Sequence, residues 1–332
     1  MANLSRDDRG QILLIAAFAL AVIFVAMALI VNSAIFTENL ATRGETAGSE
    51  GALSMRADVT ENVGEAVEAA NRNDDGSVDS VRASIRNISR QTGYQSARSG
   101  RVVDVSYKSS REGERIYQEN NSNFTNAAGD ERYQLVGNVS RVEDASGTRA
   151  FVIEASSIAD STAPFEIRVQ DSTAGGNENS WRARIWDAGS DTVHVQTVKN
   201  DSGTTVTEDC KVTTDSPGTN VTIDVTGGTI DGEECDALGT NSTGENFHFG
   251  AGTGVTPGTD DTYDISFDNA TEITGTYSLV VHDGPEDLEL LDESDGPKSN
   301  AALYNVTVEY TYLTADLRYE TDVRVAPGEP DV

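Results

Sequence analysis

A run of twenty consecutive apolar residues, Ile12–Val31, constrains the fold of this chain more than any other feature of its sequence. A helix of this length is about 30 Å long, which matches the hydrocarbon layer of a bilayer. No charge occurs between Arg9 and Glu38, so the apolar stretch can continue to about Phe36. A soluble protein would have to enclose the whole helix, and a chain this acidic and rich in Gly, Ser and Thr is poorly composed to do so. We therefore expect a transmembrane helix over residues 11–36.

The flanks of the run predict its orientation. Only about ten residues precede it, and they carry Arg6 and Arg9, whereas about 295 residues follow. The short basic leader, residues 1–10, should stay in the cytoplasm while the rest is exported, which makes a single-pass protein of the cell membrane with an extracellular C-terminal region. A removable signal peptide has a shorter apolar core of about 7 to 15 residues. The sequence therefore favours a segment that is retained.

The junction Arg9-Gly10-Gln11, followed at once by the apolar run, resembles the processing site of archaeal type IV pilins and archaellins. It also looks like the start of Tad-type minor pilins and pseudopilins. The resemblance implies that a prepilin peptidase cuts after Gly10 and leaves Gln11 as the mature N-terminus, with the helix acting as an anchor or as a filament core. Many pilins carry Glu where this chain has Ile15, which counts against a major filament subunit. The alternative is an uncleaved signal anchor in which Arg-Gly is incidental.

The composition is strongly acidic, with 55 Asp and Glu against 24 Lys and Arg and a net charge of −31. Repulsion between these carboxylates acts over about 10 Å at ordinary ionic strength but over only about 3 Å in molar salt. The composition therefore suits a halophilic archaeon. A disordered acidic tail is the alternative, but such tails hold few aromatic and β-branched residues, which this chain keeps throughout. The same imbalance argues against nucleic acid as a partner, since phosphate binding needs clustered basic side chains.

Two cysteines, Cys210 and Cys235, occur in the part expected outside the cell. In an oxidising compartment we expect them to form a disulfide, which would stabilise the fold by about 3 kcal/mol. Two free buried thiols are the alternative. No His lies near them in sequence, so they do not indicate a zinc site.

Helical periodicity follows the apolar run. Val59, Val63 and Val67 form one apolar stripe, and a second amphipathic helix is expected over residues 77–91. We expect residues 37–100 to be a helical stalk that continues the membrane helix. The turn between the two helices resembles the start of an EF-hand loop, with candidate calcium ligands at Asn71, Asn73, Asp75 and Asp79. Its twelfth position is Arg82 instead of Glu, so a polar turn without metal is the alternative.

From Arg101 onward the apolar period is two, in short segments rich in Val, Ile and Thr and separated by turn residues, which predicts antiparallel strands. The segments Trp181–Trp186 and Val193–Val198 read as a hairpin. Residues 226–298 are the poorest in pattern and are expected to be rich in loops. The predicted fold class is therefore α+β, with an N-terminal transmembrane helix extended into a helical stalk, followed by a mainly antiparallel, β-sandwich-like extracellular domain over residues 101–332.

Chemical motifs are scarce. The three His are scattered singly, and the chain has no HExxH, GxSxG, P-loop or dinucleotide fingerprint. We expect no enzyme activity, cofactor or resident metal. The sequon Asn-x-Ser/Thr, in contrast, is frequent and permits N-glycosylation at exposed positions. It begins at Asn87, Asn120, Asn123, Asn138, Asn200, Asn220, Asn241, Asn269 and Asn305.

Together these features predict a non-enzymatic cell-surface glycoprotein of a halophilic archaeon, anchored by a single membrane pass and similar to type IV minor pilins or pseudopilins. Its expected partners are membrane lipid, a prepilin peptidase, and copies of itself or other pilin-like subunits through the N-terminal helix. The alternative is a membrane-tethered binding module of the envelope that never polymerises. A third possibility, an anchored hydrolase, would use the loops of the β-sandwich.

Overall fold

The protein is mostly β-structure. The computed structural model describes residue 27 and residues 49–73, 75–142, 145–173, 179–214, 220–255, 260–282 and 296–330. Of these, 51% lie in strands and 21% are helical. The predicted β-rich character is therefore confirmed, whereas the expected α+β class is wrong.

The elements follow each other in a simple order. Residues 49–73 form a first helix, which we call the N-terminal helix. The remaining elements are α2 (Val78–Ala97), β1 (Val102–Asn123), β2 (Tyr133–Ser140), β3 (Thr148–Ile158), β4 (Phe165–Asp171), β5 (Ser180–Asp187), β6 (Thr192–Asp201), β7 (Thr204–Thr213), β8 (Val221–Asp224), β9 (Thr229–Ile230), β10 (Glu233–Glu234), the short helix η1 (Asp236–Leu238), β11 (Thr262–Asp268), the short helix η2 (Ala270–Glu272), β12 (Ile273–His282), β13 (Lys298–Leu313) and β14 (Arg318–Val325).

Two antiparallel sheets face each other as a sandwich. The eight-stranded sheet has the order β10-β9-β8-β3-β12-β1-β13-β14, and the six-stranded sheet has the order β2-β11-β4-β5-β6-β7. Alternate residues of both sheets point inward and form the sandwich core, in which Phe124, Phe165 and Phe267 pack edge to face. The predicted hairpin of residues 181–186 and 193–198 is confirmed as β5 and β6.

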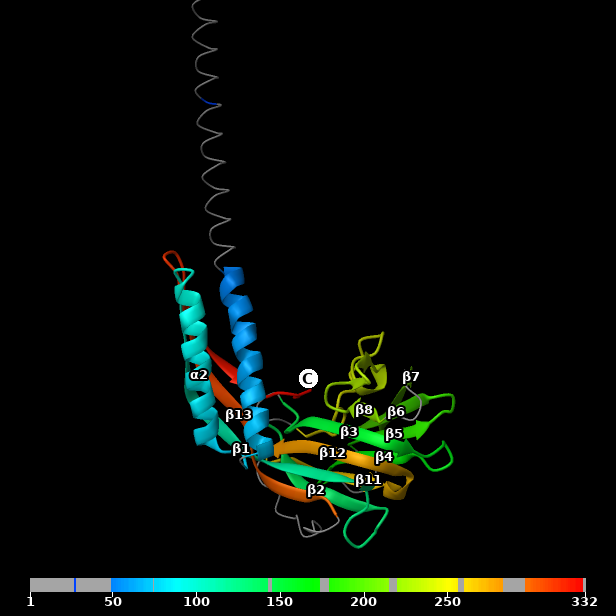
Figure 1. Cartoon of the computed structure of the whole chain (residues 1–332). Coiled ribbons are helices and arrows are strands. Elements are labelled where there is room, and N and C mark those ends of the chain that lie inside the picture. Colours follow the sequence, from blue (N-terminus) through cyan, green and yellow to red (C-terminus); the bar gives the residue numbers. More distant parts are fainter. Residues whose placement is uncertain are drawn as a thin grey trace, which may run out of the picture.

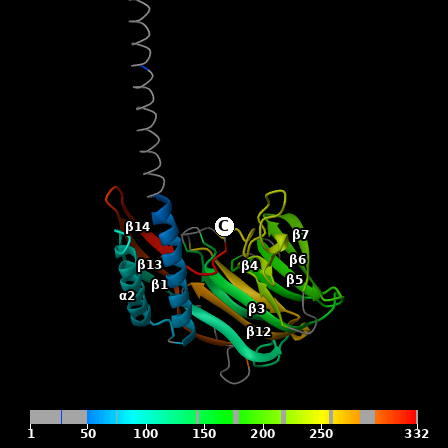
Figure 2. The same cartoon turned by 45° about the horizontal axis from the view of Figure 1, so that its top comes forward.

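A second core lies beside the sandwich. Strands β1 and β13 are long enough to leave the sandwich and pair with each other beyond it. There β13 also pairs with β14, and the N-terminal helix and α2 cover one face of the strands (Figure 1). The stripe of Val59, Val63 and Val67 packs here on the inward face of β13, which includes Val308 and Tyr310. Figure 2 shows the two helices side by side on this part of the sheet. We call this the helix-sheet core.

This packing corrects the expected stalk. The apolar stripes of the two helices were predicted from their periodicity, but their partner is the sheet made by β1, β13 and β14, not another part of a stalk. A helix of mixed polarity gains more by burying its apolar stripe on a sheet than by standing in solvent. Within the described ranges no helix is both long and apolar enough to cross a membrane. The run Ile12–Val31, except Met27, lies outside the described residues.

The segment expected to be rich in loops, residues 226–298, needs correction only in its second part: residues 226–255 hold just the two-residue strands β9 and β10 and the short helix η1. Strands β11 and β12 both lie within residues 226–298, and each is flanked by two partners in its sheet. In β11 the buried side chains are Tyr263, Ile265 and Phe267, which alternate with partly exposed polar residues up to Ser266. The alternation was present in the sequence, but turn-forming and acidic residues on both sides concealed it.

Candidate functional site

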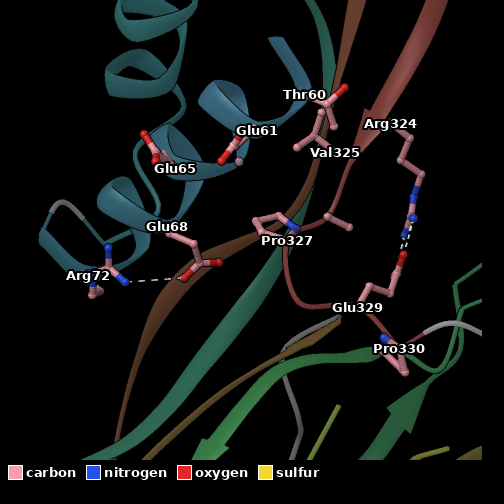
Figure 3. Close-up of a pocket in the computed structure, with 12 residues that line it drawn as sticks. Thr60, Glu61, Glu65, Glu68, Arg72, Arg324, Val325, Pro327, Glu329 and Pro330 are labelled. Atoms are coloured by element: carbon pink, nitrogen blue, oxygen red, sulfur yellow. Dashed lines mark hydrogen bonds and ion pairs between the residues drawn. The ribbon is translucent and has the colours of Figure 1, made fainter. Parts of the chain in front are cut away.

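A cleft lined by charged residues separates the N-terminal helix from the chain that follows β14 (Figure 3). Its volume is about 890 Å³. The helix contributes mainly carboxylates, and the opposite wall comes from the end of β14 and the C-terminal segment. The lining residues are Thr60, Glu61, Gly64, Glu65, Glu68, Arg72, Arg324, Val325, Ala326, Pro327, Glu329 and Pro330.

A buried arginine, Arg149 of β3, bonds to Glu68 and Pro327, which line this cleft, and its side chain is fully inaccessible to solvent. Its Nε donates to the carbonyl of Tyr304 at 2.6 Å, and its Nη2 donates to the carbonyl of Leu303 at 2.8 Å. Its Nη1 donates both to Glu68 Oε1 at 2.5 Å and to the carbonyl of Pro327 at 2.7 Å. A buried guanidinium is tolerated only when its charge and donors are satisfied, and here a carboxylate and three carbonyls satisfy them.

Further hydrogen bonds join the same elements. Asn71 of the N-terminal helix uses both ends of its amide on Leu303, donating to the carbonyl at 3.0 Å and accepting from the N–H at 2.8 Å. The Tyr304 hydroxyl donates to Glu329 at 2.7 Å, and Glu329 also pairs with Arg324. Burial, together with the Glu329 carboxylate, raises the pKa of Tyr304 well above its usual value. We call this set of contacts around Arg149 the Arg149 junction.

The Arg149 junction connects four elements that are distant in sequence. Glu68 belongs to the N-terminal helix, Arg149 to β3, Tyr304 to β13 and Glu329 to the C-terminal segment. Most of its charges neutralise each other, whereas Glu61 on the wall of the cleft is exposed. The arrangement therefore provides a firm connection between the helix-sheet core and the sandwich.

The four candidate calcium ligands have other partners. Asn71 is buried on Leu303, Asn73 donates to the Ala69 carbonyl, and Asp75 accepts from Asn300 at 3.0 Å. Asp79 lies 3.5 Å from Arg82. The described part of the chain also holds no group of three or more His, Cys, Asp or Glu side chains that could bind a metal ion. These residues form a hydrogen-bonded turn between the two helices.

The sequons differ in exposure. Five of the candidate asparagines are exposed, namely Asn87, Asn120, Asn123, Asn138 and Asn220. Asn200, Asn241 and Asn269 are half-buried, and the amide nitrogens of the last two donate to Glu208 and to the Pro164 carbonyl. Asn305 is only 3% exposed, so the folded chain leaves no room for a glycan there. The expectation for Asn305 is therefore wrong.

Cys210 and Cys235 are joined by a disulfide, with their Cα atoms 5.5 Å apart. Cys210 lies in β7 of the six-stranded sheet, and Cys235 follows β10 of the eight-stranded sheet. The bond therefore links the two sheets at one end of the sandwich. The residues of the predicted processing site, Arg9, Gly10 and Gln11, lie outside the described residues.

Sequence reasoning missed two groups of charges. Three arginines on the outer face of the six-stranded sheet converge on Glu166, with Arg184 Nε at 3.0 Å and Arg168 Nη2 at 3.1 Å. Their spacing in neighbouring strands becomes meaningful only once the register is known. The second group is the Arg149 junction, for which the only sequence signal is an arginine two positions before Phe151 in a strand whose alternate residues are apolar.

Comparisons with known proteins give one match. The Family of unknown function (DUF7261) matches residues 6–131, which include the second half of the basic leader, the apolar run, both long helices and β1. No curated protein and no solved structure matches the chain.

Proposed function

We propose that this is a non-enzymatic, single-pass cell-surface protein of a halophilic archaeon, similar to type IV minor pilins or pseudopilins, whose β-rich body is carried on the apolar segment Ile12–Val31. The observation that carries the proposal is the attachment of the N-terminal helix. This helix, the first continuous element described after the apolar run, is fastened to the β-body by the helix-sheet core and by Glu68 of the Arg149 junction. The N-terminal end of this helix therefore fixes the position of the whole β-body, and a force applied to that end acts on the whole β-body.

The charge distribution supports an extracellular location in brine. The leader carries Arg6 and Arg9, which favours retention of that end in the cytoplasm. The body carries most of the excess of carboxylates and a disulfide between Cys210 and Cys235, which suits an oxidising compartment outside the cell. The partners that follow are membrane lipid, a prepilin peptidase, and other subunits met through the N-terminal segment.

The experiment that tests this proposal is mass spectrometry of the N-terminus of the full chain from cells that contain a prepilin peptidase. A mature chain that starts at Gln11 is expected. Replacing Gly10→Val should leave an unprocessed form that is larger by the ten residues of the leader, whereas the matched control Gly44→Val should be processed normally. Unchanged processing of the Gly10 variant would refute the pilin-like assignment.

Mass spectrometry of the N-terminus also distinguishes the pilin-like protein from the alternative, a membrane-tethered envelope binding module with an uncleaved anchor. The specific observation in its favour is Ile15, which stands where many pilins have a Glu. For this alternative the mature chain would begin at Met1 or Ala2. The substitution Gly10→Val would then change nothing.

A further inference from the structure

Three exposed apolar side chains gather at one end of the helix-sheet core. Between residues 49 and 330, the large hydrophobic side chains that the structure shows as exposed are Leu53 at 51%, Tyr94 at 72% and Val102 at 56%. Leu53 lies in the first turns of the N-terminal helix, Tyr94 in the last turn of α2, and Val102 begins β1. In Figure 1 this end of the helix pair points upward, away from the sandwich.

Hydrogen bonds and strand pairing place these three elements together. The hydroxyl of Tyr310 on β13 donates to the carbonyl of Ala52, next to Leu53, at 3.1 Å. Val102 pairs with Leu313, three residues further along the same strand β13. The N–H of Arg101 donates to the Ser96 carbonyl at 3.1 Å, which holds the end of α2 on the start of β1. We call Leu53, Arg90, Tyr94, Arg98, Arg101 and Val102 the basic end.

The charge of this region is unusual for the chain. Residues 80–103 contain five arginines and no Asp or Glu, although acidic residues outnumber basic ones 55 to 24 overall. Arg82, Arg86 and Arg90 follow at intervals of four, and Tyr94 continues the series, so they lie along one side of α2. Arg86, Arg90 and Tyr94 are all exposed.

The carboxylates near the basic end are few. Glu50 precedes Leu53 on the N-terminal helix, Asp104 lies two positions after Val102 and lines a pocket with Arg90, and Asp316 lies in the turn between β13 and β14. The five arginines of residues 80–103 outnumber these three carboxylates. An anionic surface would repel most of this molecule, and it would repel the basic end least.

The chain length between the apolar run and the body limits where this end can lie. If the membrane segment ends at Phe36, twelve residues separate it from Ser49. Twelve residues span about 18 Å as a helix and at most about 40 Å when extended. The N-terminal helix begins at the basic end, so this end is held near the bilayer surface.

We propose that the basic end rests on the membrane, with Leu53, Tyr94 and Val102 in the headgroup layer and Arg90, Arg98 and Arg101 against the lipid phosphates. Tyrosine and arginine favour this layer because each has an apolar body and a polar tip. The inference rests on the proposed membrane attachment. It adds a second contact with lipid, which would fix the body against the membrane surface instead of leaving it on a loose tether.

The test uses the full chain in vesicles at molar salt, with a fluorescent label on a single introduced cysteine. Tyr94→Cys places the label at the basic end, and Ser190→Cys places it in the exposed turn between β5 and β6 as a matched control. Vesicles are made of phosphatidylglycerol, with phosphatidylcholine for comparison. We expect the label at position 94 to be quenched by headgroup-level brominated lipid and shielded from an aqueous quencher, most strongly with phosphatidylglycerol, and the label at position 190 to behave in the opposite way.

Two further variants test the contacts themselves. Leu53 and Val102 are about half exposed, so the double substitution Leu53→Ser and Val102→Ser should leave the fold intact. It should lower about tenfold the ratio of molecules whose basic end contacts the membrane to molecules whose basic end does not. Arg98→Glu with Arg101→Glu should lower the same ratio with phosphatidylglycerol and have less effect with phosphatidylcholine. If neither pair of substitutions changes the quenching, the proposed contacts are wrong.

The outcomes separate this inference from the anchor on which it rests. A chain that does not float with the vesicles would refute both the membrane anchor and the contact of the basic end with the membrane. A chain that floats with the vesicles while both labels remain accessible to the aqueous quencher would refute only the contact of the basic end with the membrane. Shielding of position 94 that rises with protein concentration and is indifferent to lipid would assign this end to a second copy of the chain, and would also overturn the proposal.

Discussion

Replacing Arg149→Met should destabilise the protein more than any other single arginine substitution on the eight-stranded sheet. The change keeps a long apolar side chain in β3 but removes every donor of the guanidinium. The carbonyl of Leu303 keeps the amide of Asn71 as a partner at 3.0 Å. Glu68 is 24% exposed and can be hydrated again. The carbonyls of Tyr304 and Pro327 lose the donor that Arg149 supplies.

The magnitude follows from these losses. The buried carbonyl of Tyr304, left without a donor, costs about 1 to 3 kcal/mol, and the partly buried carbonyl of Pro327 loses a hydrogen bond from a charged donor worth about 1.5 to 3 kcal/mol, so the two losses together cost about 2 to 6 kcal/mol. At about 2 to 4 °C per kcal/mol for a body of this size, a loss of about 4 kcal/mol lowers Tm by about 8 to 16 °C.

Thermal unfolding of the full chain in mild detergent and molar salt measures this change. Far-UV circular dichroism follows the helices, and the fluorescence of Trp181, which is buried in the sandwich core, follows the sandwich. Because Arg149 joins the two cores, we expect the helical signal of the variant to be lost at a lower temperature than the fluorescence signal. If the substitution lowered stability in general and left the connection between the two cores intact, the midpoints of both transitions would fall by the same amount.

A matched control distinguishes the junction from the effect of any lost arginine. Arg115 lies on β1 of the same sheet, donates to Ser278 at 3.1 Å and is only half-buried. Arg115→Met should therefore cost less than about 1 kcal/mol. A Tm for Arg149→Met within about 2 °C of the Arg115→Met value would refute the reasoning.

Three further predictions concern the whole body. Replacing Cys210→Ser together with Cys235→Ser should lower the free energy of unfolding by about 3 kcal/mol in a denaturant titration, and an unchanged midpoint would contradict the constraining role of the disulfide. Dialysis from molar salt to about 0.1 M should reduce the secondary structure seen by circular dichroism, and a body equally stable in both would refute the brine adaptation. Burial raises the pKa of five tyrosines, so the stability they contribute is complete below about pH 10, where unfolded tyrosine titrates, and is lost at about 1.4 kcal/mol per group per pH unit above it. Unfolding should therefore coincide with a steep rise of tyrosinate absorbance, and gradual ionisation of a folded body would contradict this. These tyrosines are Tyr133, Tyr263, Tyr277, Tyr304 and Tyr310.

Local patterns in the sequence predicted local structure well. The stripe of Val59, Val63 and Val67 indicated a helix, and the hairpin of β5 and β6 was predicted with its partners. Both rest on side chains that are neighbours within a few turns or across a short loop. The length of β1 was not predicted, because the polar stretch around Arg111 and Glu112 breaks the alternation while the strand passes from one core to the other.

The junction that determines the shape of the molecule could not be predicted in the same way. Its contacts join residues 81, 154 and 178 positions apart, from Arg149 to Glu68, Leu303 and Pro327. Three of its acceptors are backbone carbonyls, which every residue possesses, so no side-chain pattern can mark them. An arginine in phase with buried positions indicates that a partner must exist, because an unpaired buried charge is too costly to persist. Which groups accept the hydrogen bonds of Arg149 is determined by the path of β13 and the C-terminal segment. The same path places the N-terminal helix on the sheet, and this is why two helices that read as a stalk from their own sequence belong to the β-body.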